Sequence, residues 1–519
     1  MSYYRKELQQ VLCRYVTDTL IYIDTVRGFC EDVSEWGLQR ETELNMMIDI
    51  KERVDNHVSK SGSHAKLQEE LAAVLKDTLV GLAKLEYFLD AVEKLAVTSL
   101  HVFTENQALS LPKGITLDCV QVVITAARQI CPLLLKFKRD AKVFFLPRLQ
   151  NVEVFLYELD KYIRTTQKIC KTLGKSVTVF HNSLSDFHLK MTTEIVVNFD
   201  LDLSEDDMRR ILDHINQLDE IRMNKDFRVV FLFQEESFCD FIRVFSKRQD
   251  RMLEFLNDLE EGATQLDRMS KGAKISGVVG SSVGATGGVL SIVGLALIPF
   301  TAGVSLGLTM TGLGMGITSG VNSLVIIATE IRVNATQKNK AIEVFQKFME
   351  DVQSLQECLD KVTSQAELEG SIITVALGVS KGLNEVGVNA KGIDLLVDAA
   401  SASKLLRSQE LITGPLALTK AARAGFIALN ALFLGMDIFI ICKDSISLAK
   451  GSETDSSKWI RARATLWSSE MDSWKGIHDS LCEGQEKSEK KKALLETPFY
   501  PEMDVKKQSK LELEEKLLW

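Results

Sequence analysis

The sequence predicts an all-α protein, built from elongated helical bundle domains and a glycine-rich apolar helical hairpin. Three observations lead to this fold class. Apolar residues recur at steps of three and four over long stretches, which is the period of an amphipathic helix. Only 7 of the 519 residues are proline, the residue least compatible with a helix interior. Residues 275–329 carry no charged side chain, although 26% of the whole chain is charged.

Residues 1–200 are predicted to form an N-terminal helical bundle domain. Apolar residues follow the helical period through 11–29, 67–95 and 120–173. We expect the third of these runs to be interrupted at Pro132 and Pro147, because proline has no backbone N–H to donate. Loops are expected at 60–63 and 111–114, where serine, glycine and proline gather.

Residues 201–270 are predicted to be amphipathic helices that lead to the hairpin. Just before and at their start, alternating residues around 187–191 and 197–203 are compatible with short strands. Ser204, followed by three acidic residues, predicts a helix N-terminus. An apolar stripe at 238–266 is matched by one at 342–362, after the uncharged stretch. We expect these two stripes to pack against each other antiparallel, as a stalk.

Residues 271–332 are predicted to form an apolar hairpin that inserts into membranes. Two lysines precede the uncharged stretch, and Glu330 and Arg332 follow it. Its single proline, Pro299, lies near the middle and marks the hairpin turn, so both ends emerge on the same side. As a helix the first half would be about 36 Å long, enough to cross the hydrocarbon core of a bilayer.

Glycines in the hairpin form two rows at four-residue spacing, one row in each half. Such a row lies on one helix face and lets two helices approach closely in lipid. The predicted packing residues are Gly280, Gly284, Gly288, Gly312, Gly316 and Gly320. Each glycine also costs up to about 1 kcal/mol of helix propensity, which makes insertion marginal. A hairpin buried inside a soluble bundle, or a chain balanced between the two states, is the alternative.

Residues 333–450 are predicted to be a further helical region, with a second apolar segment at 424–442. This segment is just long enough to span a bilayer and contains one carboxylate, Asp437. An ionisable group inside an apolar span is a candidate intramembrane or pH-sensing residue, and its protonation would ease insertion. The alternative is a soluble amphipathic helix with Asp437 on its wet face. Residues 451–519 are predicted to be a polar C-terminal tail, in which 483–496 is a solvated helix or disordered.

Composition and motifs limit the chemistry of the chain. The net charge of −9 argues against nucleic acid as a partner. The 9 cysteines include no close pair, which favours a reducing compartment over a disulfide scaffold. The N-terminus lacks the apolar core of a signal peptide, so cytosolic synthesis is expected. Neither a nucleophile–base pairing nor a recognised metal-ligand spacing stands out. We therefore expect no enzyme activity, no metal and no cofactor.

Several stretches of the sequence resemble the apolipoprotein L family. The matching runs are LEEGATQL at 259–266, VVGSSVGATGGVL at 278–290 and, most specifically, VGLALIPFTAGVSL at 293–306. LFLGMDIFII at 432–441 resembles the C-terminal apolar segment of the family, with Asp437 as its embedded acid. The resemblance covers roughly 235–450 and leaves the N-terminal bundle uncovered. It implies binding to lipids, membranes and lipoprotein particles, and in some members ion conductance or innate defence.

From residues and resemblance together, we predict a non-enzymatic protein that binds lipids and associates with membranes. Its roles would include lipid transport, or pH-dependent membrane insertion and ion permeation. The alternative is a soluble cytosolic scaffold with a buried hairpin, whose N-terminal helical domain binds protein partners. The expected location is the cytoplasm and intracellular membranes. An extracellular, lipoprotein-associated location, as for some members of the family, is the alternative.

Overall fold

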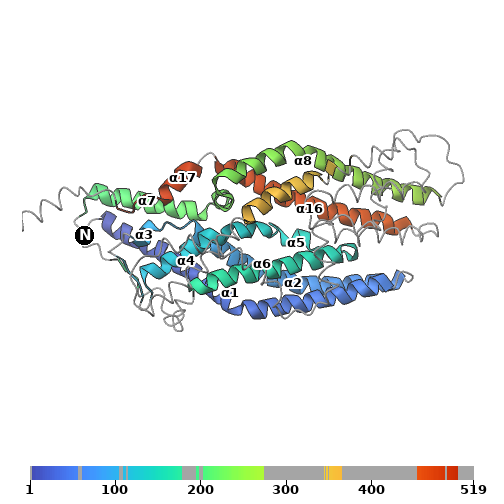
Figure 1. Cartoon of the computed structure of the whole chain (residues 1–519), viewed down its shortest axis with the longest axis horizontal. Coiled ribbons are helices and arrows are strands. Elements are labelled where there is room, and N and C mark those ends of the chain that lie inside the picture. The colour runs from blue at the N-terminus through green and yellow to red at the C-terminus, as the bar shows by residue number, and fades with distance from the viewer. Residues whose placement is uncertain are drawn as a thin grey trace, which may run out of the picture.

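The computed structural model describes residues 3–56, 61–104, 109–112, 115–177, 195–197, 203–273, 344, 347–348, 350–364, 453–485 and 488–500. Of these residues 90% are helical, which confirms the predicted all-α fold. The helices follow the long axis of an elongated molecule (Figure 1). The predicted hairpin and the second apolar segment lie outside the described residues.

The N-terminal bundle starts with two long helices, α1 (Tyr3–Asn56) and α2 (Ser61–Ala96), which lie antiparallel. Trp36 on α1 donates through Nε1 to the carbonyl oxygen of Gly81 on α2, at 2.9 Å. Nearer the other end of the pair, Arg53 and Glu70 form an ion pair at 2.5 Å. The expectation of a loop at 60–63 is wrong for residues 61–63, because α2 already begins at Ser61.

The third helical run is broken where the prolines stand. After α3 (His101–Thr104), α4 runs over Leu117–Ile130 and gives way to a 3-10 helix, η1 (Cys131–Lys136). Pro132 lies in the first turn of η1, where a missing N–H costs nothing. Pro147 lies between α5 (Ala141–Phe144) and η2 (Leu149–Asn151), and α6 follows as Val152–Val177. Both predicted interruptions are confirmed.

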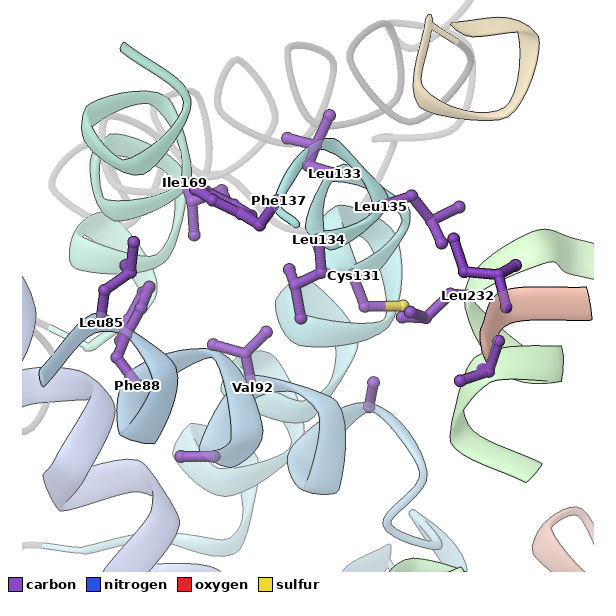
Figure 2. Packing of buried hydrophobic residues seen from close by; sticks show 14 of the residues in the cluster. Leu85, Phe88, Val92, Cys131, Leu133, Leu134, Leu135, Phe137, Ile169 and Leu232 are labelled. Carbon is purple, nitrogen blue, oxygen red and sulfur yellow. The ribbon is translucent and has the colours of Figure 1, made fainter. Parts of the chain in front are cut away.

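The break at Pro132 is followed by η1, which lies in the hydrophobic core. Figure 2 shows Leu133, Leu134 and Leu135 of η1 among side chains of three other helices. These come from α2, α6 and a later helix, α8 (Lys225–Ala273). All three leucines are buried. The short 3-10 helix therefore joins the N-terminal bundle to the helices that follow it.

A two-stranded sheet and a capped helix follow the N-terminal bundle along the chain. β1 (Leu109–Ser110) pairs antiparallel with β2 (Val196–Val197), Leu109 opposite Val197. Of the strand predicted at 197–203, Val197 lies in β2 and Leu203 lies in no strand; residues 198–202, like 187–191, lie outside the described residues. α7 (Glu205–Met223) begins as predicted, because the hydroxyl of Ser204 accepts a hydrogen bond from the Asp207 N–H at 3.1 Å.

A second bundle consists of three helices, and we call it the anchor bundle. Its members are α8, the return helix (residues 350–364, preceded by helical residues 344, 347 and 348) and α16 (Glu453–Gln485). A short helix, α17 (Ser488–Leu495), follows α16. α8 and α16 lie side by side over much of their length (Figure 1).

The C-terminal region differs from the polar tail that we expected. α16 buries one side chain every seventh residue, a spacing that lines one side of a helix. These residues are Ile460, Trp467, Trp474 and Leu481. Leu495 on α17 is 1% exposed, and the Ser99 hydroxyl donates to its carbonyl oxygen at 2.9 Å. α17 is thus docked on the N-terminal bundle through its last residue.

Candidate functional site

The anchor bundle is the candidate functional site, because its helices adjoin both predicted apolar segments. α8 ends at Ala273, directly before the uncharged stretch, and the return helix follows that stretch. α16 begins at Glu453, shortly after the segment 424–442.

The stalk predicted from the two apolar stripes is confirmed for the described residues. Phe255 on α8 stacks on Phe348, with ring centroids 4.3 Å apart. Further along, Arg248 of α8 donates to the hydroxyl of Ser354 at 3.2 Å. Earlier residues of α8 thus meet later residues of the return helix, which makes the two helices antiparallel. Both stripes bury their aromatic residues at this contact, as the helical spacing of the apolar residues predicts.

α16 adds a third helix, which is also antiparallel to α8. Arg461 near the start of α16 pairs with Glu260 at 3.0 Å. Seventeen residues later, His478 lies 2.9 Å from the Ser246 hydroxyl. Phe348 of the return helix meets the Trp467 ring edge to face, at 5.3 Å. The end of α8 and the starts of the return helix and α16 therefore lie at the same end of the anchor bundle.

A buried carboxylate fastens the return helix to α8. Asp351 is 1% exposed and accepts hydrogen bonds from two arginines of α8. Arg248 donates through Nε at 2.9 Å, and Arg251 donates through Nε at 2.9 Å and through Nη2 at 2.5 Å. The hydrogen bond to Asp351 raises the pKa of Arg251, against the opposing effect of burial. A buried carboxylate that is paired with two arginines makes a strong local contact, because removal of either partner leaves a buried charge without a counter-charge.

Sequence reasoning missed this clamp, although a signal was present. Asp351 lies three residues after Phe348 and one before Val352, so it occupies a place on the apolar face of the return helix. Arg248 and Arg251 are three residues apart and share one face of α8. An acid on a core face and two arginines on the facing stripe together indicate a buried ion pair.

A serine, a histidine and an acid also come together between α8 and α16. His478 lies 2.9 Å from the Ser246 hydroxyl through Nε2, and 3.1 Å from the Asp479 carboxylate through Nδ1. Cys482 lies 3.6 Å from the same Nε2. Ser246 lies inside α8, where backbone N–H groups are bonded within the helix. The set joins α8 to α16 by side-chain hydrogen bonds.

The other face of α16 contacts the N-terminal bundle through buried polar groups. The Lys138 ammonium donates to Oε1 of Glu470 at 2.7 Å and lies 3.8 Å from Glu158 on α6. Arg463 donates to the carbonyl oxygen of Gln150 at 3.0 Å. Burial lowers the pKa of Arg463, and the negative charge of Glu153 opposes this effect. α16 thus connects the anchor bundle to the N-terminal bundle through these buried polar contacts.

The residues predicted as site residues from the sequence lie outside the described part of the chain. These are the glycine rows, the hairpin turn and the embedded acid, namely Gly280, Gly284, Gly288, Gly312, Gly316, Gly320, Pro299 and Asp437. Their roles stay predictions. Among the described residues, no group of three or more histidine, cysteine or acidic side chains is placed to hold a metal ion.

One stretch of the described residues is long and apolar enough to cross a membrane by length and composition. It is Leu117–Phe144, which covers α4, η1 and α5, and 56% of its most apolar window is buried inside the molecule. Core helices of soluble proteins share these properties. We assign this stretch to the core of the N-terminal bundle.

Comparison with known proteins gives a consistent match for the second half of the chain. The family model for apolipoprotein L matches residues 193–473, which include α7, α8 and most of α16. Human apolipoprotein L3 is 26% identical over 44% of this chain, and human apolipoprotein L6 is 26% identical over 43%. Human apolipoprotein L domain-containing protein 1 is 30% identical over 20% of the chain. No solved structure matches.

The matched region is longer than the sequence resemblance suggested and includes helices on both sides of it. The chain spans 59% of the length of apolipoprotein L3, 68% of apolipoprotein L6 and 37% of the domain-containing protein. The N-terminal bundle precedes the matched region.

Proposed function

Because this chain belongs to the apolipoprotein L family, we propose that it is a lipid-binding protein whose apolar segments insert into membranes conditionally. The proposed location is the cytoplasm and the surface of intracellular membranes. The proposed activity is non-enzymatic, in line with the sequence, in which no nucleophile–base pairing stands out.

The observation that carries this proposal is that three helix ends lie together at one end of the anchor bundle. They are the C-terminal end of α8 and the N-terminal ends of the return helix and α16. α8, the return helix and α16 are connected to the uncharged stretch or to the segment 424–442, and they share a core of aromatic rings. This arrangement supports a bundle that holds the helices adjoining both apolar segments in place. Opening the bundle would release both segments together, because each of the three helices packs on the other two.

Insertion requires that apolar surface moves from protein to lipid without leaving buried charges unpaired. The clamp at Asp351 holds the closed state, in which the apolar faces of all three helices are covered. In the open state the uncharged residues 275–329 would enter the bilayer at little electrostatic cost. Asp437 would enter with the second segment once protonated, because an ionised carboxylate at the bilayer centre costs about 3 kcal/mol. Acid would therefore promote insertion.

Flotation with liposomes tests the proposal directly. Full-length protein is mixed with anionic phospholipid vesicles, over a pH series from neutral to about 5, and is separated by density. We expect a floating fraction that grows as the pH falls. Asp437→Asn removes the titrating carboxylate and should shift the profile toward neutral pH. Absence of flotation at every pH would exclude the proposal, and an unchanged profile in the variant would remove Asp437 from it.

A scaffold function is the second candidate, and one observation favours it. The N-terminal bundle and the anchor bundle share a continuous hydrophobic core, so the N-terminal domain is fixed relative to the rest and could present a rigid surface to protein partners. Limited proteolysis distinguishes the two candidates. Cleavage within 275–329 that is equally slow with and without vesicles favours the scaffold, whereas cleavage altered by vesicles favours insertion.

A further inference from the structure

The N-terminal bundle holds α16 along the middle of its length. The side-chain amide of Asn151 in η2 donates a hydrogen bond to the carbonyl oxygen of Ala462 at 3.1 Å. About three turns further along α16, the Ser473 hydroxyl accepts a hydrogen bond from the backbone N–H of Arg139 at 3.3 Å. The two donors lie on either side of α5, where prolines break the third helical run. The broken part of the N-terminal bundle is therefore the part that receives α16.

A buried ion pair lies between these two hydrogen bonds. The Lys138 ammonium is 2.7 Å from Oε1 of Glu470 on α16 and 3.8 Å from the carboxylate of Glu158 on α6. Both carboxylates are buried. Glu158 has a second cation, Lys161, at 3.2 Å, whereas Lys138 is the cation that pairs with Glu470. Loss of Lys138 would therefore leave Glu470 as the buried charge without a counter-charge.

The N-terminal bundle also holds α8, close to its start. Arg228 is 4% exposed and donates to two acids of α2, through Nη2 to Asp90 at 2.9 Å and through Nε to Glu93 at 3.1 Å. α8 and α16 are two of the three helices of the anchor bundle, and both are fastened to the same hydrophobic core. The N-terminal bundle therefore connects α8 to α16 by a second route, in addition to their direct contact.

Polar contacts of this kind suit a restraint that can be released. Removal of one partner from a buried ion pair is costly, because the other charge stays buried. Separation of the two helices is different, since both charges then reach water, and their hydration offsets much of the lost attraction. The contacts therefore fix the position of α16 without making its release prohibitively costly.

We propose that the N-terminal bundle is a built-in restraint, which keeps the anchor bundle closed by holding α8 and α16 against one body. Release of α16 from the N-terminal bundle would allow it to separate from α8 and from the return helix. The consequence rests on the proposed function: a closed anchor bundle withholds the apolar segments from the membrane, so the N-terminal bundle is autoinhibitory. This role belongs to a part of the chain that precedes the region matched by the family model.

Hydrogen exchange of the full-length protein, measured without lipid, tests the restraint. Lys138→Met removes the ammonium and keeps a side chain of similar length, so the unpaired charge of Glu470 favours movement of α16 into water. We expect the amides of the return helix, residues 350–364, to exchange about tenfold faster, the effect of losing one hydrogen bond to a charged group. Lys142→Met is the matched control, because Lys142 is exposed and lies four residues away.

A second variant tests the restraint at the contact with α8. Arg228→Gln removes the charge that holds α8 to α2, while Asp90 keeps its ion pair with Lys94 at 2.7 Å. It should also speed exchange in the return helix, although the substituted residue lies on a different helix. The two variants change separate contacts, so the test does not depend on the folding of one of them.

Exchange in the middle of α1 is the internal reference, because a general loss of stability would speed it as well. A return helix that exchanges at the wild-type rate in both variants, or faster only together with α1, would show that the N-terminal bundle does not restrain the anchor bundle.

Flotation with anionic phospholipid vesicles at neutral pH tests the autoinhibitory consequence. Both variants should float more than the wild-type protein and the Lys142→Met control. If the wild-type protein floats in acid, but faster exchange in the variants brings no added flotation at neutral pH, the N-terminal bundle is not autoinhibitory. Faster exchange in the variants, with no flotation of any protein at any pH, would uphold the restraint and exclude the proposed function.

Discussion

Gly484 marks the closest approach between α16 and α8. A Cβ at this residue would be 2.4 Å from Cγ2 of Val230 and 3.0 Å from the carbonyl oxygen of Asp226, which belongs to the backbone and cannot move aside. Gly476, two turns earlier on the same helix, has open space where a Cβ would lie. The two glycines therefore have opposite roles, although their sequence contexts are similar. Sequence alone does not separate them, because the difference arises from the facing helix.

Replacing each glycine by alanine tests this difference. Gly484→Ala should lower the free energy of unfolding by about 1–3 kcal/mol, because α16 must shift away from α8. Gly476→Ala should raise it by about 0.5–1 kcal/mol, because alanine favours the helix and limits the unfolded chain. Chemical denaturation of both variants gives the two values. Equal effects of the two substitutions would mean that α16 is not packed on α8 as described.

The helices of the anchor bundle show how far amphipathic patterns predict packing. The stripes at 238–266 and 342–362 predicted two antiparallel helices, and the contact between Phe255 and Phe348 confirms them. α16 was not predicted, because its average composition is polar and suggests a solvated segment. The signal was the seven-residue recurrence from Ile460 to Leu481, which marks one buried face. The roles of Asp437 and the glycine rows stay predictions from the sequence.

The clamp between α8 and the return helix can be weakened without changing the apolar core. Asp351→Asn leaves two arginines facing a neutral amide and removes hydrogen bonds to a charged acceptor. It should lower the free energy of unfolding by about 2 kcal/mol and increase the floating fraction at neutral pH. Glu350→Gln is the matched control, because Glu350 is adjacent and exposed. Thermal denaturation and liposome flotation measure the two effects. Similar results for both variants would show that the clamp does not hold the closed state.

At the scale of the whole molecule, the N-terminal bundle and the apolipoprotein-L-like region form one body. Arg222 at the end of α7 is completely buried between α1 residues, 3.0 Å from the Thr19 hydroxyl and with its guanidinium 4.0 Å from the Tyr15 ring centroid. The sequence predicted an N-terminal helical bundle domain over 1–200, not covered by the family resemblance, followed by four further regions, and these divisions stay predictions. Contacts between residues two hundred positions apart, such as this one, leave no periodic signal in a sequence.

His214 of α7 makes this junction sensitive to acid. Its Nε2 is buried and meets no hydrogen-bond partner among the described residues. Burial lowers the pKa of His214, and the nearby His101 of α3 adds to the effect. Beyond His101 lies Glu496, whose carboxylate is 3.9 Å from the His101 ring. Because the folded pKa lies below the unfolded one, the unfolded chain takes up the proton first. The stability due to neutral His214 is therefore complete above about pH 6.5 and is lost as the pH falls further.

His214→Asn should accordingly flatten the pH dependence of stability. The Tm of the wild-type protein should fall as the pH decreases from about 6.5 toward 5. The Tm of the variant should fall less over the same range, because asparagine does not ionise. His64→Asn is the control, because His64 is exposed on α2 and its loss should leave the wild-type slope unchanged. If loosening of this junction contributes to insertion, the variant should also float with liposomes at a lower pH than wild type. A variant with the wild-type slope would place the acid response elsewhere, and Asp437 in the second apolar segment would then be the first residue to examine.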